Sequence, residues 1–172
     1  MTDLLTPAPS LTQLSEEERL FRASVRNFAE AEIAPRVRDM EEQGAIPRAL
    51  VDQLFDLGVM AIEIPETFGG AGGTFFLSVI AVEELSRVDP SVAVLVDVQN
   101  TLVVNALVKW GSVDVQQRFL TALAAGTIGA YALSEAGSGS DAFALKTRAV
   151  EDGDDYVLTG RKLWITNARE AG

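Results

Sequence analysis

Cysteine and histidine are both absent from the 172 residues of the sequence. Their absence excludes disulfides, thiol nucleophiles, serine–histidine catalytic pairs and the usual zinc ligands. Any proton transfer must therefore use Asp, Glu, Lys, Tyr or a bound cofactor. A chain without cysteine also suits a reducing compartment, and we expect a cytoplasmic protein.

Basic residues are fewer than acidic ones: the sequence has 14 Lys and Arg against 25 Asp and Glu, which gives a formal net charge of -11. Such a surface repels phosphate backbones, so nucleic-acid binding is not expected. The N-terminus has neither an apolar core nor an Arg-rich pattern, so no signal or transit peptide is expected. Asp97, Gln99, Asn100 and Asn105 interrupt the most apolar run, which predicts a buried core segment and no membrane span.

Helical patterns fill roughly the first 125 residues. Ser15 and Glu18 form a capping box, Pro35 is expected to kink or end the helix that follows, and Gly44 to terminate its continuation. Alternating valines after Ser91 resemble a strand, but the unbroken length of the run to Trp110 favours a helix. The further expected helices are Pro47 to Gly58, 77–88, 90–110 with Asp89 as its N-cap, and 112–126 with Ser112 as its N-cap.

The pattern changes at Gly129, after which apolar and polar residues alternate. Strands are expected over 128–133, 143–150 and 156–166, with a turn between the last two. The predicted fold class is α+β: a flexible lead-in (1–14), an α-helical domain (15–128) and the start of a β-domain (129–172). Three or four strands with open edges do not make a self-sufficient sheet. We therefore expect the chain to be part of a longer protein, or to be completed by another chain.

The stretch YALSEAGSGSDAFALK (131–146) resembles a phosphate-binding loop. A Rossmann fingerprint would need a third glycine and a following helix, whereas Gly137 and Gly139 are followed by Ala142 and a predicted strand. No Gly-Lys-Ser/Thr follows either, so the P-loop pattern is also excluded. On its own, the stretch is more typical of a plain turn between strands than of a binding loop.

Two longer strings are more specific than the glycines. ALSEAGSGSDAFALKTRA (132–149), followed by LTGRKLWITNA (158–168), resembles the acyl-CoA dehydrogenase family, and the resemblance extends over residues 15–172. It is strongest to the short/branched-chain members. The resemblance implies a helical N-terminal domain, then an antiparallel β-barrel-like domain. It also implies a C-terminal four-helix domain that the 172 residues do not contain.

Family members bind FAD and oxidise an acyl-CoA to the trans-2-enoyl-CoA. A glutamate removes the α-proton and the β-hydrogen leaves as hydride to flavin N5. The resemblance places that glutamate in the missing C-terminal part, so no residue of this chain is assigned as catalytic. Glu135 and Asp141 are expected to stabilise their loop. The resemblance also implies an electron-transfer-flavoprotein-type acceptor and a homotetramer at full length.

The resemblance also implies binding residues, and no metal. The cofactor contacts are Tyr131, Leu133, Ser134, Gly139, Ser140, Trp164, Ile165 and Thr166, and the substrate contacts are Ser140, Asn100 and Thr101. Fixed backbone and hydroxyl donors there would stabilise the negative charge that builds on a flavin during reduction. Each has a plainer alternative: turn hydrogen bonds for the serines, a sheet-core position for Trp164, and a solvated polar stripe for Thr101.

Two other functions stay open at this point. An acyl-CoA oxidase or a flavin monooxygenase of the same fold would differ in how oxygen reaches the reduced flavin. A non-catalytic interaction or assembly module would need neither base nor flavin.

Overall fold

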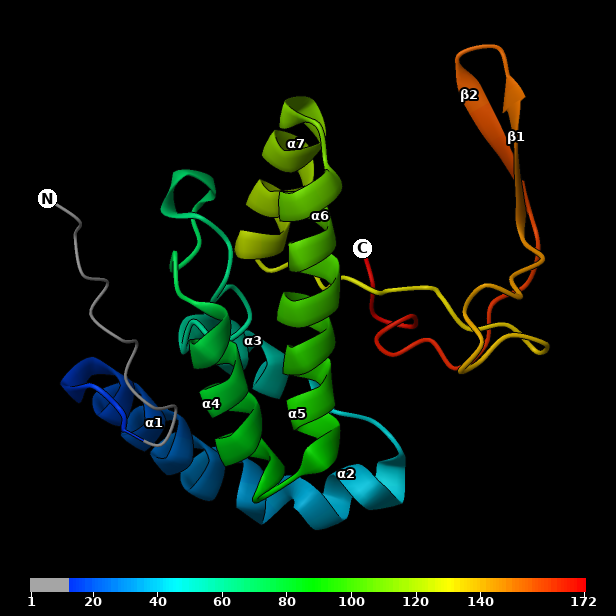
Figure 1. Ribbon diagram of the computed structural model, residues 1–172. Coiled ribbons are helices and arrows are strands. Elements are labelled where there is room, and N and C mark those ends of the chain that lie inside the picture. The colour runs from blue at the N-terminus through cyan, green and yellow to red at the C-terminus, as the bar shows by residue number, and fades with distance from the viewer. Residues whose placement is uncertain (1–12) are drawn as a thin grey trace, which may run out of the picture.

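The computed structural model describes residues 13–172, so nearly all of the expected lead-in lies outside the described residues (Figure 1). The helices are α1 (Glu16–Phe28), a π-helical segment η1 (Ala29–Ile33), a 3-10 turn η2 (Ala34–Arg36), α2 (Val37–Gln43), α3 (Arg48–Asp56), a 3-10 turn η3 (Glu66–Phe68), α4 (Phe75–Ser86), α5 (Pro90–Asp97), a π-helical segment η4 (Val98–Val104), α6 (Asn105–Trp110) and α7 (Val113–Ala124). Two strands follow, β1 (Arg148–Asp152) and β2 (Asp155–Thr159).

The first helix begins and ends where local chemistry predicts. The Ser15 hydroxyl accepts from the Glu18 amide at 3.1 Å, and the Glu18 carboxylate accepts from the Ser15 amide at 2.7 Å, which confirms the capping box. Pro35 lies in η2, directly after η1, so the helix leaves α geometry around the proline as predicted. Gly44 then ends α2 in the left-handed conformation, at φ 62°.

One long helix, made of α5, η4 and α6, runs from Pro90 to Trp110. The Asp89 carboxylate caps it by accepting from the amides of Ser91 and Val92 at 2.7 and 3.0 Å, and Gly111 ends it. The helix prediction is therefore confirmed over the alternating-strand alternative. By length and composition alone this helix is also long and apolar enough to cross a membrane, and 44% of its apolar window is buried within the protein.

The helical core is formed by α1, α3, α4 and α5. Fully buried side chains such as Val25, Leu54 and Leu85 fill it. A bidentate ion pair links two of these helices, because the Arg26 guanidinium donates to both oxygens of the buried Glu84 carboxylate at 2.7 Å. The Arg26 hydrogen bonds lower the pKa of Glu84, so this carboxylate is ionised inside the core.

The expected strands are only partly confirmed. β1 and β2 form an antiparallel hairpin in which Arg148 pairs with Thr159, and the hairpin projects away from the helices (Figure 1). Both are shorter than predicted. The prediction of a strand over 128–133 is wrong: this segment has no regular secondary structure, and the backbone of Gly129 bonds to side chains and not to a neighbouring strand.

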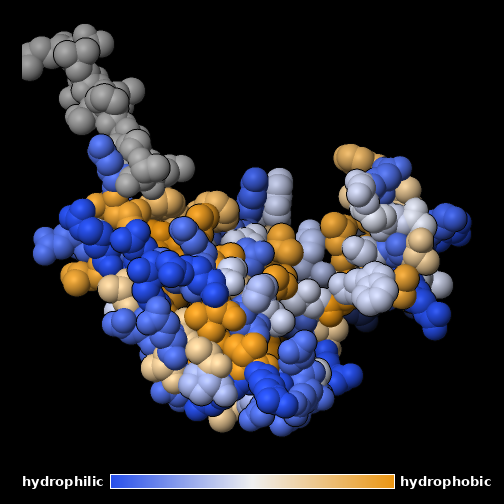
Figure 2. All heavy atoms as spheres, turned by 90° about the horizontal axis from the view of Figure 1, so that it is seen from below, coloured by the Kyte–Doolittle hydropathy of each residue, from blue (hydrophilic) through white to orange (hydrophobic). Residues whose placement is uncertain are grey.

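The surface at the lower end of the molecule in Figure 1 carries both hydrophobic and hydrophilic side chains. Seen from this end, which includes α2, hydrophobic side chains gather across the middle, and hydrophilic ones surround them (Figure 2). A cavity of about 720 Å³ lies near this end, between α2, the start of α5 and residues 166–170.

Candidate functional site

The two segments that carry the family resemblance lie side by side. The Leu163 amide donates to the Ser134 carbonyl at 2.9 Å, and the Lys162 ammonium donates to the Leu133 carbonyl at 2.9 Å. The loop 131–141 therefore contacts the segment 161–167, although the bonded residues Leu133 and Lys162 are 29 positions apart in the sequence. The predicted cofactor residues of both segments come from this one region.

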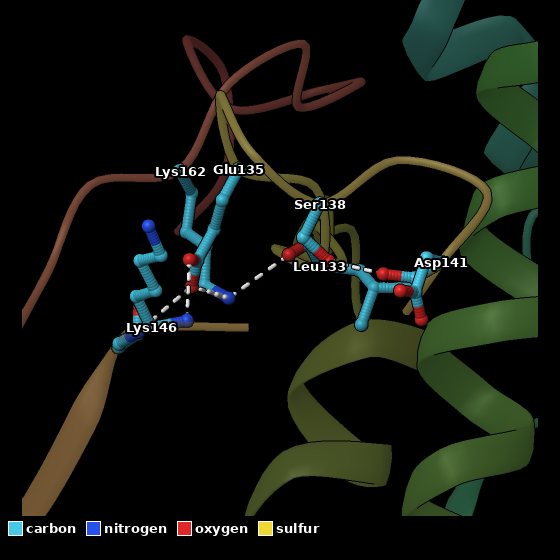
Figure 3. Close-up of polar contacts among 7 residues, drawn as sticks. Leu133, Glu135, Ser138, Asp141, Lys146 and Lys162 are labelled. Carbon is cyan, nitrogen blue, oxygen red and sulfur yellow. Dashed lines mark hydrogen bonds and ion pairs between the residues drawn. The ribbon is translucent and has the colours of Figure 1, made fainter. Parts of the chain in front are cut away.

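Glu135 holds the loop together from below its backbone (Figure 3). Its carboxylate accepts from the Lys146 amide at 2.7 Å, the Thr147 amide at 3.0 Å and the Lys162 ammonium at 2.9 Å. Its side chain is only 8% exposed. Its own backbone exchanges hydrogen bonds with Ser138, at 3.0 and 3.1 Å. This carboxylate is therefore occupied in joining the loop, the start of β1 and the segment after β2.

The pKa of Glu135 falls to about 2. The neighbouring Thr147 hydroxyl contributes most, followed by the Lys146 amide and the Lys162 ammonium. The Thr147 oxygen is buried and, among residues 13–172, lies outside normal hydrogen-bond geometry, so it acts here through its proximity. A carboxylate with so low a pKa is a weak base at neutral pH, which agrees with a structural role.

This pKa predicts how the loop responds to acid. The folded-state pKa of about 2 lies below the ordinary glutamate value, so the Glu135 contacts stabilise the loop fully above about pH 4.3. That stabilisation is lost as the pH falls from about 4.3 through 2. We expect the carboxyl ¹³C signal of Glu135 to titrate near pH 2, and higher in a Lys162→Met variant. A midpoint near 4.3 in the unsubstituted protein would contradict these contacts.

Ser138 and Asp141 close the tip of the loop. The Ser138 hydroxyl is buried and donates to the Asp141 carbonyl at 2.7 Å, while an Asp141 carboxylate oxygen accepts from the Phe143 amide at 3.2 Å. Both side chains are therefore engaged in turn geometry, as expected for residues of this type.

Several backbone N–H donors of the loop have no hydrogen-bond acceptor among the described residues. In the described part of the chain, the amides of Ala132, Leu133 and Ser134 meet no protein acceptor. A Cβ added at Gly137 or Gly139 would meet no atom within 4 Å, and neither glycine has a positive φ. Packing within this chain therefore does not require either glycine, and the loop offers donors next to an unobstructed backbone.

Trp164 combines a left-handed backbone with an almost fully exposed side chain. Its backbone has φ 58°, in the left-handed region that few residues other than glycine adopt, and the residue is 94% exposed. It lies outside both strands, so the alternative of a sheet-core aromatic is wrong for this structure. Asn167, at φ 67°, is the second such residue, and the two flank the half-buried Ile165 and Thr166. Backbone strain of this kind persists only where surrounding contacts impose it.

Two of the predicted substrate residues, Asn100 and Thr101, lie in η4, whereas Ser140 belongs to the loop. Asn100 is fully buried. Its amide oxygen accepts from Ile62 N at 2.9 Å, and its amide nitrogen donates to the carbonyls of Val59 and Val96 at 2.8 and 3.0 Å. Thr101 is half-buried and donates to Asp97, its carbonyl at 2.9 Å and its carboxylate at 2.8 Å. The Asn100 side chain thus has its hydrogen bonds inside the helical domain.

Two residues outside the predicted set of binding residues hold the junction between the helices and the loop. Gln99 is fully buried and accepts from the Gly129 amide at 2.7 Å, while Asn167 donates to the Gly129 carbonyl at 3.2 Å. A polar residue inside an apolar run was the only available signal for Gln99. Of the predicted cofactor residues, only Thr166 lines the 720 Å³ cavity. Between residues 13 and 172, no cluster of acidic side chains is arranged to hold a metal ion.

The architecture is that of a helical domain leading into a β-hairpin region, with a donor-rich loop at the junction, and comparisons with known proteins identify its class. The sequence model of the acyl-CoA dehydrogenase N-terminal domain matches residues 15–127, and that of the middle domain matches residues 130–172. The chain therefore belongs to the acyl-CoA dehydrogenase family.

Its similarity to particular members is also high. It is 50% identical over 163 residues to a probable short/branched chain specific acyl-CoA dehydrogenase of Dictyostelium discoideum, covering 94% of this chain and 40% of that protein. It is 40% identical over 166 residues to the mitochondrial short/branched chain specific acyl-CoA dehydrogenase of Bos taurus, covering 96% and 38%. A glutaryl-CoA dehydrogenase of Mycobacterium smegmatis, solved in complex with FADH2, matches with a TM-score of 0.86 at 33% identity, covering 92% and 41%. The chain spans about 40% of the length of these relatives.

Proposed function

We propose that this chain supplies the flavin-binding loop and helical domain of an FAD-dependent acyl-CoA dehydrogenase acting on short or branched acyl groups. The observation that carries the proposal is the contact between loop 131–141 and segment 161–167, with open backbone donors on the loop. Bound FAD would supply the acceptor for the hydride that leaves the β-carbon of the acyl-CoA. No base is assigned within these residues, and the glutamate base is proposed to belong to the C-terminal part of the full-length protein.

The residues present fit a flavin. The amides of Leu133 and Ser134 can donate to ring carbonyl oxygens, and the Ser134 hydroxyl is a further donor. Such fixed donors stabilise the negative charge that reduction builds on the ring. The unobstructed backbone at Gly139 allows close approach of a ligand, which explains a glycine that the chain's own packing does not require. The exposed Trp164 indole offers a flat apolar face for the ring.

The substrate residues divide into two kinds. Ser140 is exposed on the loop, so we assign it direct contact with FAD and with the CoA part of the substrate. Thr101 borders the acyl group from the helix. Asn100 acts indirectly, because its buried amide holds the chain at Val59 and Ile62 against η4 and thereby fixes the wall that Thr101 belongs to.

The remaining parts of the proposal concern the full-length protein. Its electron acceptor is of the electron-transfer-flavoprotein type, and its assembly is a homotetramer. Its location is the cytoplasm, supported by the lack of cysteine, which suits a reducing compartment. Fractionation of the native cells tests the location, and the mitochondrial naming of the Bos taurus relative makes the mitochondrion the competing result.

FAD binding tests the proposed site. We expect FAD to quench the fluorescence of Trp164, and a Gly139→Ala variant to bind FAD about tenfold more weakly, since a methyl group would occupy space that the ligand needs. The thermal stability should be unchanged, because this Cβ meets no protein atom. A Trp110→Phe background removes the other tryptophan signal. If FAD bound equally well to the Gly139→Ala variant, the loop would not be the cofactor site.

Activity separates the alternatives. The 172-residue chain is expected to show no acyl-CoA-dependent dye reduction, because the proposed base is not among its residues. In the full-length protein, anaerobic reduction by a short branched acyl-CoA with little peroxide formed in air supports a dehydrogenase. Rapid peroxide release would identify an oxidase.

A further inference from the structure

Gly129 lies where three parts of the chain meet: η4, the loop that begins at Tyr131, and the segment that contains Trp164. Both of its backbone polar groups are bound by side-chain amides. The Gln99 oxygen accepts from its N–H at 2.7 Å, and the Asn167 amide donates to its C=O at 3.2 Å. No strand supplies either bond, so these two side chains replace the pairing that an extended segment normally finds in a sheet.

The same two amides also bind their surroundings. Gln99 donates to the Thr127 carbonyl at 3.1 Å, and Asn167 donates to the Leu95 carbonyl of α5 at 3.4 Å. The long helix thus contacts Thr127, Gly129 and Asn167. A side chain at Gly129 would be excluded, because its Cβ would lie 2.6 Å from Val103 Cγ1.

We propose that Gln99 and Asn167 form an amide clamp on Gly129, and that this clamp positions the Trp164–Thr166 segment against loop 131–141 for flavin binding. The last clause rests on the function proposed above. Asn167 follows Thr166 directly, so a fixed Asn167 fixes the end of the segment. The hydrogen bond from the Leu163 amide to the Ser134 carbonyl fixes the start of the segment. The left-handed backbone of Trp164 and Asn167 is the conformation that these two anchors impose.

Gln99 and Asn167 are positioning residues in this proposal, because they act through the segment and not by touching the cofactor. Two substitutions of Asn167 separate its amide from its backbone. Asn167→Gly keeps the left-handed conformation and removes the donor. Asn167→Asp also tolerates that conformation, but places a carboxylate beside the carbonyl oxygens of Gly129 and Leu95.

We expect FAD affinity to fall about tenfold in Asn167→Gly, the value of one to two neutral hydrogen bonds, and about 100-fold in Asn167→Asp. The thermal midpoint should change by no more than about 3 °C, because the helical core does not include Asn167. Asn105→Asp is the matched control, since Asn105 also donates to a carbonyl, that of Thr101 at 3.3 Å, but from α6. Its FAD affinity should equal that of the unsubstituted protein.

Amide hydrogen exchange provides a readout without flavin. Exchange at Leu163 should accelerate at least about tenfold in both Asn167 variants, while the Gly129 amide stays protected by Gln99. Accelerated exchange at Leu163 in a protein that never binds FAD would support the amide clamp. It would overturn both the proposed function and the role of the clamp in flavin binding. Unchanged exchange at Leu163 would overturn the clamp. Unchanged FAD affinity despite accelerated exchange would overturn its role in positioning the cofactor segment.

Discussion

Replacing Asn100 by alanine should destabilise the helical domain by about 3–4 kcal/mol, because the substitution leaves several buried backbone groups without partners. The amide oxygen of Asn100 accepts from Ile62 N, and its nitrogen donates to the carbonyls of Val59 and Val96. None of these groups can reach water, since the side chain is fully buried. The denaturant midpoint should fall with little change in the m-value, because the extent of unfolding is the same.

Asn105→Ala provides the comparison for this substitution. Asn105 lies five residues further along the same helix, half-buried, with a single 3.3 Å hydrogen bond to the Thr101 carbonyl. Its replacement should change the unfolding free energy by less than about 0.5 kcal/mol, because alanine favours the helix and little burial is lost. Equal effects of the two substitutions would show that the Asn100 contacts do not stabilise the fold.

Replacing Gly70 by alanine should be nearly as damaging, with a loss of about 3 kcal/mol. An added Cβ would overlap the Ile64 carbonyl oxygen and lie 2.6 Å from its carbonyl carbon. The Gly72 amide donates to that same oxygen at 2.9 Å, and the neighbouring Gly73 amide donates to the Ile62 carbonyl at 2.7 Å. The turn must open to accommodate the methyl group, and thermal unfolding measures the cost.

Gly137→Ala is the matched control, since its Cβ would meet no atom within 4 Å, and we expect a change within about 0.5 kcal/mol. The Gly70 and Asn100 substitutions both act on the segment around Ile62, so they should not be additive. The double variant should lose less than the sum of the two single losses. Full additivity would mean that the turn and the Asn100 amide stabilise separate regions.

The ends of the helices could be predicted from the sequence because short-range chemistry determines them. Ser15 and Asp89 each cap a helix with a side chain two or three residues from the amide that it binds. The strand expected over 128–133 is absent because its partners are not local. Gln99 and Asn167, about thirty and forty residues from Gly129, take the backbone bonds that a strand would have used. Alternation of residue types cannot reveal such partners.

Only part of the candidate site could be predicted from the sequence, because part of it depends on contacts between distant residues. The family resemblance selected loop 131–141 and the Trp164 segment, and the structure places them in contact. It could not show that Trp164 has a left-handed backbone, or that the Asn100 side chain is enclosed. Both properties depend on tertiary contacts, which the order of residue types does not encode directly.

The π-helical segment η4 also constrains how the sequence can change in length. It contains Gln99 and Asn100, adjacent residues that are both fully buried and that bind different parts of the chain. An α-helix turns by about 100° per residue. Deleting one residue between 98 and 104 would therefore restore regular winding and rotate one of the two amides away from its partners. This helix can accept many substitutions along its exposed side, but it has almost no tolerance for a gain or loss of a single position.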